Sequence, residues 1–338
     1  MHKEREYILE EIITMVHGSG GSATGELIER VFAKEFNNDV LNQMEDSAVV
    51  EGAGRIAVTT DSFVVTPAEF RGGDIGRLCI CGTVNDLLMR GARPEYITCG
   101  FILEEGVRIE MLQRVVHSMA ETAREAGVKI VAGDTKVVNG KGELYINTAG
   151  VGFVPDNVDI RSAGAQEGDV IIVSGTMGDH HAAILSERME IDTDVESDNA
   201  PLVDMVGNLL KAGIEVHTLR DITRGGLGTV LKELAESSGR TFYINDQDIP
   251  VKKVVRDFCG LLGLDPLYMG NEGKLTAIVA GKDGEKALEI IRNSRYGEDA
   301  AIIGEVKSET PGEVILRTAI GGKRIIDVLQ GEGLPRIC

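Results

Sequence analysis

The chain has 338 residues, of which 43% are apolar, so it is long enough to form two packed domains. Its 54 acidic residues outnumber its 35 basic ones, and the resulting formal charge of -19 argues against binding to nucleic acid or to anionic membranes. The first six residues are charged without a signal-peptide core after them, and no run of about 18 apolar residues follows anywhere. These features predict a cytoplasmic protein that does not enter the membrane.

The cysteines do not form a disulfide framework. They are odd in number and widely spread: Cys79, Cys81, Cys99, Cys259 and Cys338. Secreted frameworks are denser and even-numbered. The pair at 79 and 81 lacks the second pair or the spaced histidines of a zinc site, so buried free thiols are predicted there.

The first predicted elements are a strand, a glycine loop and a helix. Residues 12–16 are apolar, residues 17–21 read His-Gly-Ser-Gly-Gly, and apolar residues recur at helical spacing from Leu27 to Phe32. This order can hold a phosphate on backbone N–H groups and the helix N-terminus. The loop fits G-x-G-x-x-A, but no acidic residue of a dinucleotide fold follows at the required spacing, so a plain tight turn is an equal alternative.

The rest of the chain mixes strands and helices without strict βαβ alternation, which favours an α+β fold. In the first half, we predict strands at 55–65, 96–103, 129–132 and 144–154 and helices at 75–88 and 109–123. In the second half, we predict strands at 169–174, 242–244, 275–280, 301–306 and 313–317 and helices after 180, at 202–210, after 226 and at 284–293. The turn-rich segment 155–168 separates a domain at 1–156 from one at 157–320.

Residues 321–338 are predicted to form a flexible tail that ends in a thiol. Its last eight residues contain two glycines and one proline and show no helical or strand periodicity. A free thiol titrates near pKa ~8.5, so a basic site would convert Cys338 into a nucleophilic thiolate. Extended residues after Gly322 would reach roughly 50 Å. Taken alone, this pattern favours a loose chain end with an incidental cysteine.

Four aspartates stand at or near the ends of predicted elements: Asp46, Asp61, Asp86 and Asp134. Magnesium is commonly bound by carboxylates together with substrate phosphates, so these residues are candidate ligands for a metal and a nucleotide. Lys136 would add a positive charge for a phosphate oxygen. For each aspartate alone, a helix cap or a turn residue is the favoured interpretation, and only their combination with the glycine loop favours a site. The chain lacks the P-loop, protein-kinase, H-E-x-x-H and G-x-S-x-G signatures, so a nucleotide site would be of another type.

The chain resembles the HypE hydrogenase maturation factors, members of an ATP-binding superfamily that includes aminoimidazole ribonucleotide synthetase, selenophosphate synthetase and thiamine monophosphate kinase. The resemblance covers residues 15–338. It is carried by the segments at 17–21, 72–76, 82–86, 133–136, 221–226 and 271–274 and, for HypE itself, by Pro-Arg-Ile-Cys at 335–338.

The resemblance implies a two-domain aminoimidazole ribonucleotide synthetase-like fold, a homodimer whose amino-terminal sheets pair, and ATP with Mg²⁺ in a cleft beside the interface. It implies that the carbamoyltransferase HypF carbamoylates Cys338, that ATP drives dehydration of the carboxamide to a thiocyanate, and that the cyanide passes to [NiFe] hydrogenase iron through a HypC–HypD scaffold. The implied catalytic residues are Cys338, Glu272 as general base and Lys136. The implied nucleotide-binding residues are Gly18, Gly20, Gly21, Asp46, Asp61, Asn85, Asp86, Asp134, Asp221 and Arg224, with Asp46, Asp61, Asp86 and Asp134 as magnesium ligands.

Two alternatives remain. A selenophosphate synthetase-like enzyme of the same superfamily would carry its reactive cysteine beside the amino-terminal glycine loop, where this chain has none. A non-catalytic thiol or metal carrier would use Cys338 without turning over a nucleotide, and would leave the aspartates and Lys136 without a role.

Overall fold

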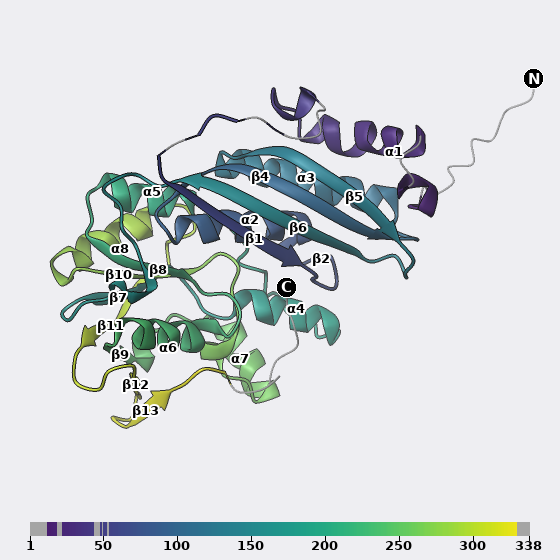
Figure 1. Ribbon diagram of the computed structural model, residues 1–338. Helices are drawn as coiled ribbons and strands as arrows, with labels where there is room; N and C mark the ends of the chain where they lie inside the picture. Colours follow the sequence, from purple (N-terminus) through teal and green to yellow (C-terminus); the bar gives the residue numbers. More distant parts are fainter. Residues whose placement is uncertain (1–11, 19–21, 44–47, 49, 53, 330–338) are drawn as a thin grey trace, which may run out of the picture.

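The computed structural model describes residues 12–18, 22–43, 48, 50–52 and 54–329 (Figure 1). Each half of the chain is built on its own sheet. The first sheet has the strand order β1-β6-β4-β5, and the second has the order β13-β12-β9-β11-β7-β10-β8. Strands and helices are mixed in both halves, so the predicted α+β class is confirmed.

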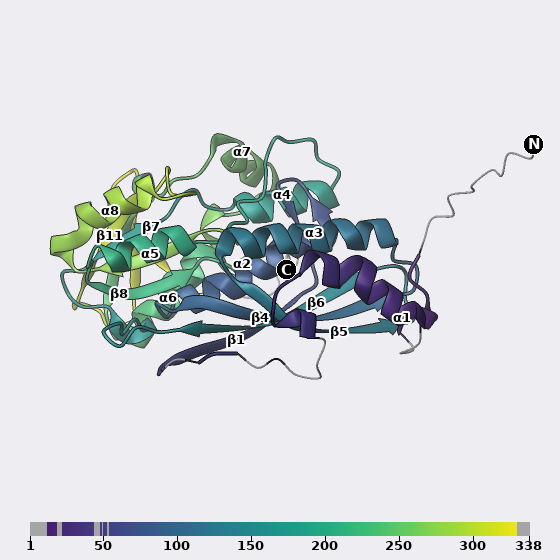
Figure 2. The ribbon, with the colours of Figure 1, turned by 90° about the horizontal axis from the view of Figure 1, so that it is seen from above.

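Among the described residues, helices cover one face of the first sheet. Helices α2 and α3 pack on that face, with the short amino-terminal helical segments beside α3 (Figure 2). The elements of this half are η1 (Met15–Gly18), α1 (Ser22–Leu27), η2 (Ile28–Ala33), η3 (Leu41–Gln43), β1 (Ile56–Phe63), β2 (Glu69–Phe70), β3 (Gly73–Asp74), α2 (Ile75–Leu88), β4 (Arg93–Glu104), α3 (Ile109–Ala126), β5 (Lys129–Val138) and β6 (Leu144–Phe153).

The two helices differ in sequence because they differ in burial. Helix α3 has one apolar stripe and ends at Gly127, whose φ of 71° is the left-handed conformation that glycine adopts at low cost. Helix α2 is buried on almost every side, because the first sheet lies on one side of it and the second half of the chain on the other. It begins at Asp74, whose carboxylate accepts a hydrogen bond from the Arg77 N–H at 2.8 Å.

The second sheet carries helices on both faces. Helices α5 and α8 continue the core of the first half, while α6 closes a separate core on the opposite face. The elements of this half are η4 (Ser162–Gly164), β7 (Val170–Val173), α4 (Asp179–Arg188), α5 (Val203–Lys211), β8 (Val216–Asp221), α6 (Gly226–Ser238), β9 (Thr241–Asn245), η5 (Asp246–Asp248), α7 (Lys253–Leu262), η6 (Pro266–Tyr268), β10 (Leu275–Val279), η7 (Gly281–Asp283), α8 (Gly284–Asn293), β11 (Ala301–Lys307), β12 (Val314–Arg317) and β13 (Lys323–Ile326).

Side chains of α2 join the two halves. The Arg77 guanidinium donates to the carbonyl of Asn199 at 2.9 Å, to the Glu125 carboxylate at 2.9 Å and to the Tyr296 hydroxyl at 3.2 Å. A planar guanidinium can make all three bonds at once because its donors point in fixed and different directions. This network connects α2 to the second half of the chain.

Two predictions about local structure are wrong. Residues 12–16 form no strand: Ile12 makes one isolated bridge to Arg108, and a 3-10 turn begins at Met15. The segment is apolar because Ile13 is fully buried against Val107, with which its N–H bonds at 2.7 Å. The predicted strand at 129–132 is too short, because β5 continues to Val138 and contains the Gly-Asp-Thr-Lys segment.

The tail predicted from residue 321 begins too early. Residues Lys323–Ile326 form strand β13, which pairs antiparallel with β12 at the edge of the second sheet. The described chain then continues to Leu329, and the rest of the predicted tail lies outside the described residues. No described helix is both long enough and apolar enough to span a bilayer.

Candidate active site

A polar cavity of about 390 Å³ lies between the two halves of the chain. Residues of β1 and α2 line one side of it, and the end of β8 with the segment that leads into α6 lines the other. The lining residues are Thr60, Asp61, Ser62, Phe63, Gly82, Asp86, Met89, Arg90, Arg220, Asp221, Thr223, Arg224 and Glu272. Five residues proposed from the sequence therefore meet here: Asp61, Asp86, Asp221, Arg224 and Glu272.

Three carboxyl groups of this cavity stand close enough to affect one another. Burial raises the pKa of Asp61 and of Asp86, and the neighbouring Asp61 raises the pKa of Asp86 further. Burial, with a contribution from Asp86, raises the pKa of Asp221 to about 7. The Thr59 hydroxyl donates to the Asp86 carboxylate at 2.7 Å and fixes its orientation. These three carboxyl groups concentrate negative charge in the cavity, which suits it to bind a cation or a ligand that carries a bound cation.

Glu272 reaches the cavity from a loop that is fixed on all sides. Its side chain is only 4% exposed, and its backbone N–H donates to the Asp198 carboxylate at 3.0 Å. The preceding Asn271 is fully buried and accepts a hydrogen bond from the Gly178 N–H at 2.8 Å. A Cβ at Gly273 would lie 1.9 Å from the Asp198 carbonyl oxygen, so only glycine fits there. The loop thus holds one carboxylate rigidly against the cavity.

Asp134 and Lys136 do not lie in this cavity. The register pairs Asp61 with Thr148 and Thr148 with Cys99 on the helix-covered face, whereas Asp134 pairs with Gly100 and lies on the opposite face. Strands β1 and β5 are also the two edges of the sheet, about 14 Å apart. Within one chain, the expectation that these residues converge with Asp61 and Asp86 is therefore wrong.

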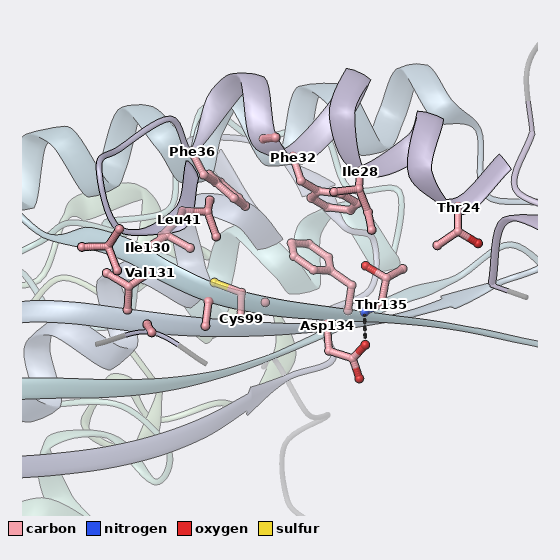
Figure 3. Close-up of a pocket in the computed structure, with 16 residues that line it drawn as sticks. Thr24, Ile28, Phe32, Phe36, Leu41, Cys99, Ile130, Val131, Asp134 and Thr135 are labelled. Atoms are coloured by element: carbon pink, nitrogen blue, oxygen red, sulfur yellow. Dashed lines mark hydrogen bonds between the residues drawn. The ribbon is translucent and has the colours of Figure 1, made fainter. Parts of the chain in front are cut away.

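Figure 3 shows the two sides of β5. Thr135 points toward an apolar cavity of about 250 Å³ beneath α1 and η2, while Asp134 points away from it. The Lys136 ammonium donates to the Asp134 carboxylate at 2.9 Å, and this pair lowers the pKa of Asp134. Phe32 and Phe101 pack across the apolar cavity with ring centroids 4.8 Å apart. This apolar cavity and the polar cavity share no lining residue.

Asn85, which was predicted to contact a nucleotide, has a structural role between the two halves. Its side chain is 2% exposed and does not line the polar cavity. Its amide donates to the Ala200 carbonyl at 3.0 Å and its oxygen accepts from the Leu202 N–H at 2.9 Å. Asn85 therefore connects α2 to the second half, and its contact with a nucleotide stays a prediction.

Gly18 ends η1 and lies against β5, where a Cβ would come within 2.8 Å of Val137. Like Asn85, it does not line the polar cavity. Gly20, Gly21, Asp46 and Cys338 lie outside the described residues.

The described chain matches known proteins over both halves. Residues 44–154 match the family described as AIR synthase related protein, N-terminal domain, and residues 166–317 match its C-terminal domain. Carbamoyl dehydratase HypE of Azotobacter vinelandii is 49% identical over 331 residues, which cover 96% of this chain and 97% of that protein. The HypE of Escherichia coli K12 is 46% identical over 96% of this chain and 99% of its own length. The chain belongs to the HypE family.

Solved structures agree with this assignment. A HypE crystal structure in complex with ATP superposes with a TM-score of 0.93 at 45% identity, covering 96% of this chain and 99% of that one. The HypE in a HypE–HypF complex superposes with a TM-score of 0.79 at 46% identity, covering 90% of this chain and 99% of that one. A thiamine-monophosphate kinase shares the fold at 21% identity with a TM-score of 0.67, covering 87% of this chain and 95% of that one.

In this member of the HypE family, the internal cysteines are unsuited to nucleophilic chemistry. Cys79, Cys81, Cys99 and Cys259 are all free and buried. Burial raises the pKa of each, to about 12 for Cys99 and about 11 for Cys259, so all four are protonated at neutral pH. Among the five cysteines of the sequence, this leaves Cys338 as the candidate nucleophile.

The polar cavity of this HypE chain provides suitable ligands for magnesium when a substrate supplies the remainder. No three acidic, histidine or cysteine side chains among the described residues lie close enough to hold a metal by themselves. Asp61 and Asp86 nevertheless offer carboxylate oxygens, the ligands that Mg²⁺ prefers, and magnesium usually completes its coordination with phosphate oxygens and water. Burial raises the pKa of both carboxyls, and Asp61 adds repulsion at Asp86; a bound cation would relieve both effects.

Two arginines of the cavity were not singled out by sequence analysis. Arg90 follows α2 directly, and Arg220 immediately precedes Asp221 in β8. Neither belongs to a repeated pattern, and β8 itself was not predicted. Only the approach of α2 to the end of β8 brings these residues to one cavity.

Asp221 gives a pH-dependent stability that can be measured in metal-free protein. Its folded pKa of about 7 exceeds its ordinary value of 3.8, so between these pH values the unfolded chain binds fewer protons than the folded one. Stability from this group is therefore lost as pH rises from about 4 to about 7. Asp221→Asn removes that loss and should raise the melting temperature by roughly 2–4 °C more at pH 8 than at pH 5. An equal change at both pH values, measured by calorimetry with a chelator present, would contradict the assignment.

Proposed function

We propose that this chain is an ATP-dependent carbamoyl dehydratase of hydrogenase maturation that acts on the carboxamide attached to its own Cys338. The observation that carries the proposal is 49% identity over nearly the full length to a protein named carbamoyl dehydratase HypE. The polar cavity supports it, because Asp61, Asp86, Asp221 and Glu272 surround a space of about 390 Å³. The expected location in the cytoplasm belongs to the same proposal.

The reaction needs activation of an amide oxygen, which is a poor leaving group. Transfer of the γ-phosphoryl group of ATP to that oxygen turns it into phosphate, and loss of two N–H protons with departure of phosphate leaves S–C≡N on Cys338. The first step requires alignment and charge stabilisation. Asp61 and Asp86 would hold Mg²⁺, which when bound neutralises charge on the phosphates. Glu272 faces the same cavity and is the candidate base for the N–H protons.

A homodimer would bring Lys136 and Asp134 to this chemistry. The open face of the first sheet is apolar near β1, where Val58 is 71% and Ile56 is 52% exposed. Exposed apolar surface of this kind is commonly covered by a partner. We propose that two open sheet faces pack together, so that Lys136 of one chain approaches the nucleotide bound near β1 of the other.

The dimer predicts a defined effect of charge on that face. Val58→Asp should give a monomer in sedimentation equilibrium, because a desolvated carboxylate in a sheet-to-sheet contact is strongly unfavourable. Ile325→Asp, on the exposed edge of the second sheet at 65% exposure, is the matched control and should stay dimeric. If the unsubstituted chain is already a monomer, or if both variants are dimers, the proposed interface is wrong.

The partners follow from the proposed reaction. HypE in a HypE–HypF complex is a close structural relative, and we propose HypF as the carbamoyl donor for Cys338. Delivery of the cyanide to a HypC–HypD scaffold would complete the transfer to [NiFe] hydrogenase iron. A non-catalytic thiol carrier is the alternative from another class, and the carboxylate cavity argues against it.

The deciding experiment follows the mass of the tail. After carbamoylation by HypF, addition of ATP and Mg²⁺ should remove one water from the peptide that ends in Cys338, as measured by mass spectrometry after proteolysis. A nonhydrolysable ATP analogue should leave the carbamoyl group intact. ATP consumption without any change in this peptide would exclude the proposed dehydration, and absence of nucleotide turnover would favour the carrier.

A further inference from the structure

A second polar cavity, of about 260 Å³, lies on the other side of α2 from the first. Arg77 of this helix lines the second cavity, whereas Asp86 lines the first. Nine positions along a helix turn the direction of a side chain by about 180°, so these two residues point to opposite sides. Residues of segments 175–179 and 196–199, in the second half of the chain, also line the second cavity. A molecule bound there would therefore contact both halves.

One short loop reaches both cavities. Glu272 lines the first cavity, and Lys274, two residues later, lines the second. The Lys274 side chain packs on Gly175, where a Cβ would lie 2.9 Å from its Cε. Asp198, which also lines the second cavity, accepts a hydrogen bond from the Glu272 N–H at 3.0 Å. A ligand bound to Lys274 or Asp198 would therefore act on the backbone that positions Glu272.

Buried polar atoms without a hydrogen-bond partner among the described residues gather in the lining of the second cavity. They are Oδ1 of Asp179, Oδ2 of Asp198 and both amide atoms of Asn199. Asp179 is fully buried, and Asn199 is 4% exposed. The other oxygen of Asp179 accepts from the Thr176 hydroxyl at 2.6 Å and pairs with the Lys252 ammonium at 2.7 Å. Leaving buried polar atoms unpaired is unfavourable, so a ligand that donates hydrogen bonds to these oxygens would bind with a gain in free energy.

The second cavity offers charges of both signs. The Lys274 ammonium forms no ion pair within the described part of the chain. Burial raises the pKa of Asp198, the positive charge of Lys274 opposes this rise, and the negative charge of Asp179 adds to it. The cavity thus combines an ammonium group that has no ion-pair partner with two carboxylates that each have a buried oxygen without a donor. A ligand with a single charge would satisfy only one of these needs.

We propose that the second cavity binds a small dipolar ion of the α-amino acid class, with the ligand carboxylate on Lys274 and the ligand ammonium on Asp198 and Asp179. Both groups of such a ligand are ionised at neutral pH. Their hydrogen bonds to the cavity are charge-assisted, which makes them about twice as strong as hydrogen bonds between neutral groups. The ligand fills the unmet needs of both signs with one small molecule.

The remaining charges of the lining narrow the class of ligand. Three further acids of the second cavity are exposed to solvent: Glu196, Glu298 and Asp299. They make a basic side chain on the ligand more favourable than an acidic one. The same lining argues against two simpler occupants, because Lys252 and Lys274 repel a metal ion and the carboxylates repel inorganic phosphate. Free L-arginine is therefore the probe for this site.

Isothermal titration calorimetry on the full chain tests the site with three probes. These are L-arginine, agmatine, which is arginine without its carboxylate, and L-glutamate. We expect one L-arginine to bind per chain, and agmatine and L-glutamate to bind at least about 10-fold more weakly. Lys274→Met and Asp198→Asn should each weaken L-arginine binding by about 10- to 100-fold, the effect of one charge-assisted hydrogen bond. Agmatine that binds as tightly as L-arginine, or no binding of any probe, would overturn the proposal.

Matched variants place the binding in the second cavity. Lys282→Met removes an exposed lysine that pairs with Glu215, and Asp61→Asn removes a carboxylate of the first cavity. Both should bind L-arginine as the unsubstituted chain does. Lys274→Arg keeps the positive charge and should recover most of the affinity that Lys274→Met loses, which a folding defect at this position would not allow. Weakening by Asp61→Asn that equals the weakening by Lys274→Met would assign the ligand to the first cavity and overturn the proposal.

Binding should also accelerate the dehydration, and only this part rests on the proposed function. A ligand that holds Lys274 and Asp198 also holds the loop that positions Glu272. We expect saturating L-arginine to raise the single-turnover rate of water loss by about 5-fold or more, and to have no such effect in Lys274→Met. An unchanged rate would overturn the link to Glu272. A chain that binds L-arginine but never loses water would refute the dehydratase and support the site, whereas loss of water without binding would refute the site alone.

Discussion

Replacing Asp86 with asparagine is expected to lower the rate of dehydration of the carbamoylated tail by on the order of 10³-fold while leaving the fold intact. Asparagine keeps the oxygen that accepts the Thr59 hydroxyl but removes a negative charge from the cavity. Without that charge, the proposed magnesium ion loses a ligand, and the transferred phosphoryl group loses charge stabilisation. The measurement is single-turnover mass spectrometry of the peptide that ends in Cys338.

The controls for Asp86→Asn address folding and the preceding step. Carbamoylation by HypF should proceed at an unchanged rate, since it does not use this cavity. Asp192→Asn, which changes an exposed carboxylate in the loop after α4, should leave both reactions unchanged. Loss of carbamoylation along with dehydration would indicate a folding defect, and an unchanged dehydration rate would remove Asp86 from the proposed site.

Replacing Glu272 with glutamine should lower the dehydration rate by about 10²- to 10⁴-fold, the range of general acid–base catalysis. Glutamine fits the same buried position, so the loop bonded to Asp198 should keep its conformation. Activation of the amide oxygen does not require a base at this position, whereas removal of the N–H protons does. In Glu272→Gln, ADP should therefore form faster than the thiocyanate. A rapid-quench assay that measures both ADP and the loss of water would detect this difference.

Two further variants test the role of Glu272. Glu298→Gln, which changes an exposed acid of a separate polar cavity, should have no effect on either step. Asp198→Asn weakens the acceptor of the Glu272 N–H without removing the carboxylate, and should give a smaller loss than Glu272→Gln. A Glu272→Gln variant that slows ADP formation as strongly as water loss would assign Glu272 to phosphoryl transfer and exclude it as the base.

Much of the architecture could be predicted because long elements carry strong local signals. The apolar stripe of α3 and the left-handed Gly127 at its end are both properties of adjacent residues. Strand β13 could not be found in this way, since three of its four residues are exposed and its pairing with β12 leaves no pattern in its own sequence. Residues 12–16 gave a false strand because burial of Ile13 against Val107 requires the same apolar residues as a sheet does.

The candidate site, too, was predictable only where its residues carry local sequence signals. Asp61, Asp86, Asp221 and Glu272 carried recognisable motifs, and the structure places all four around one cavity. Whether Asp134 joins them depends on the strand register and on the order of strands in the sheet. These put Asp134 on the face opposite to that of Asp61, in the edge strand farthest from β1. Asn85 precedes Asp86 in the sequence, but successive residues of a helix point in different directions. Asn85 therefore contacts the second half instead of the cavity.

The sequence by itself determined the family and the carboxylates of the cavity, because those features reside in short contiguous motifs whose chemistry is local. Tertiary structure alone decided which of these carboxylates share a cavity, that Asp61 and Asp86 act on Asp221, and that Arg90 and Arg224 line the same cavity. The physical reason is that pairing register and interdomain packing fix distances between residues far apart in the chain, and charge interactions depend on those distances.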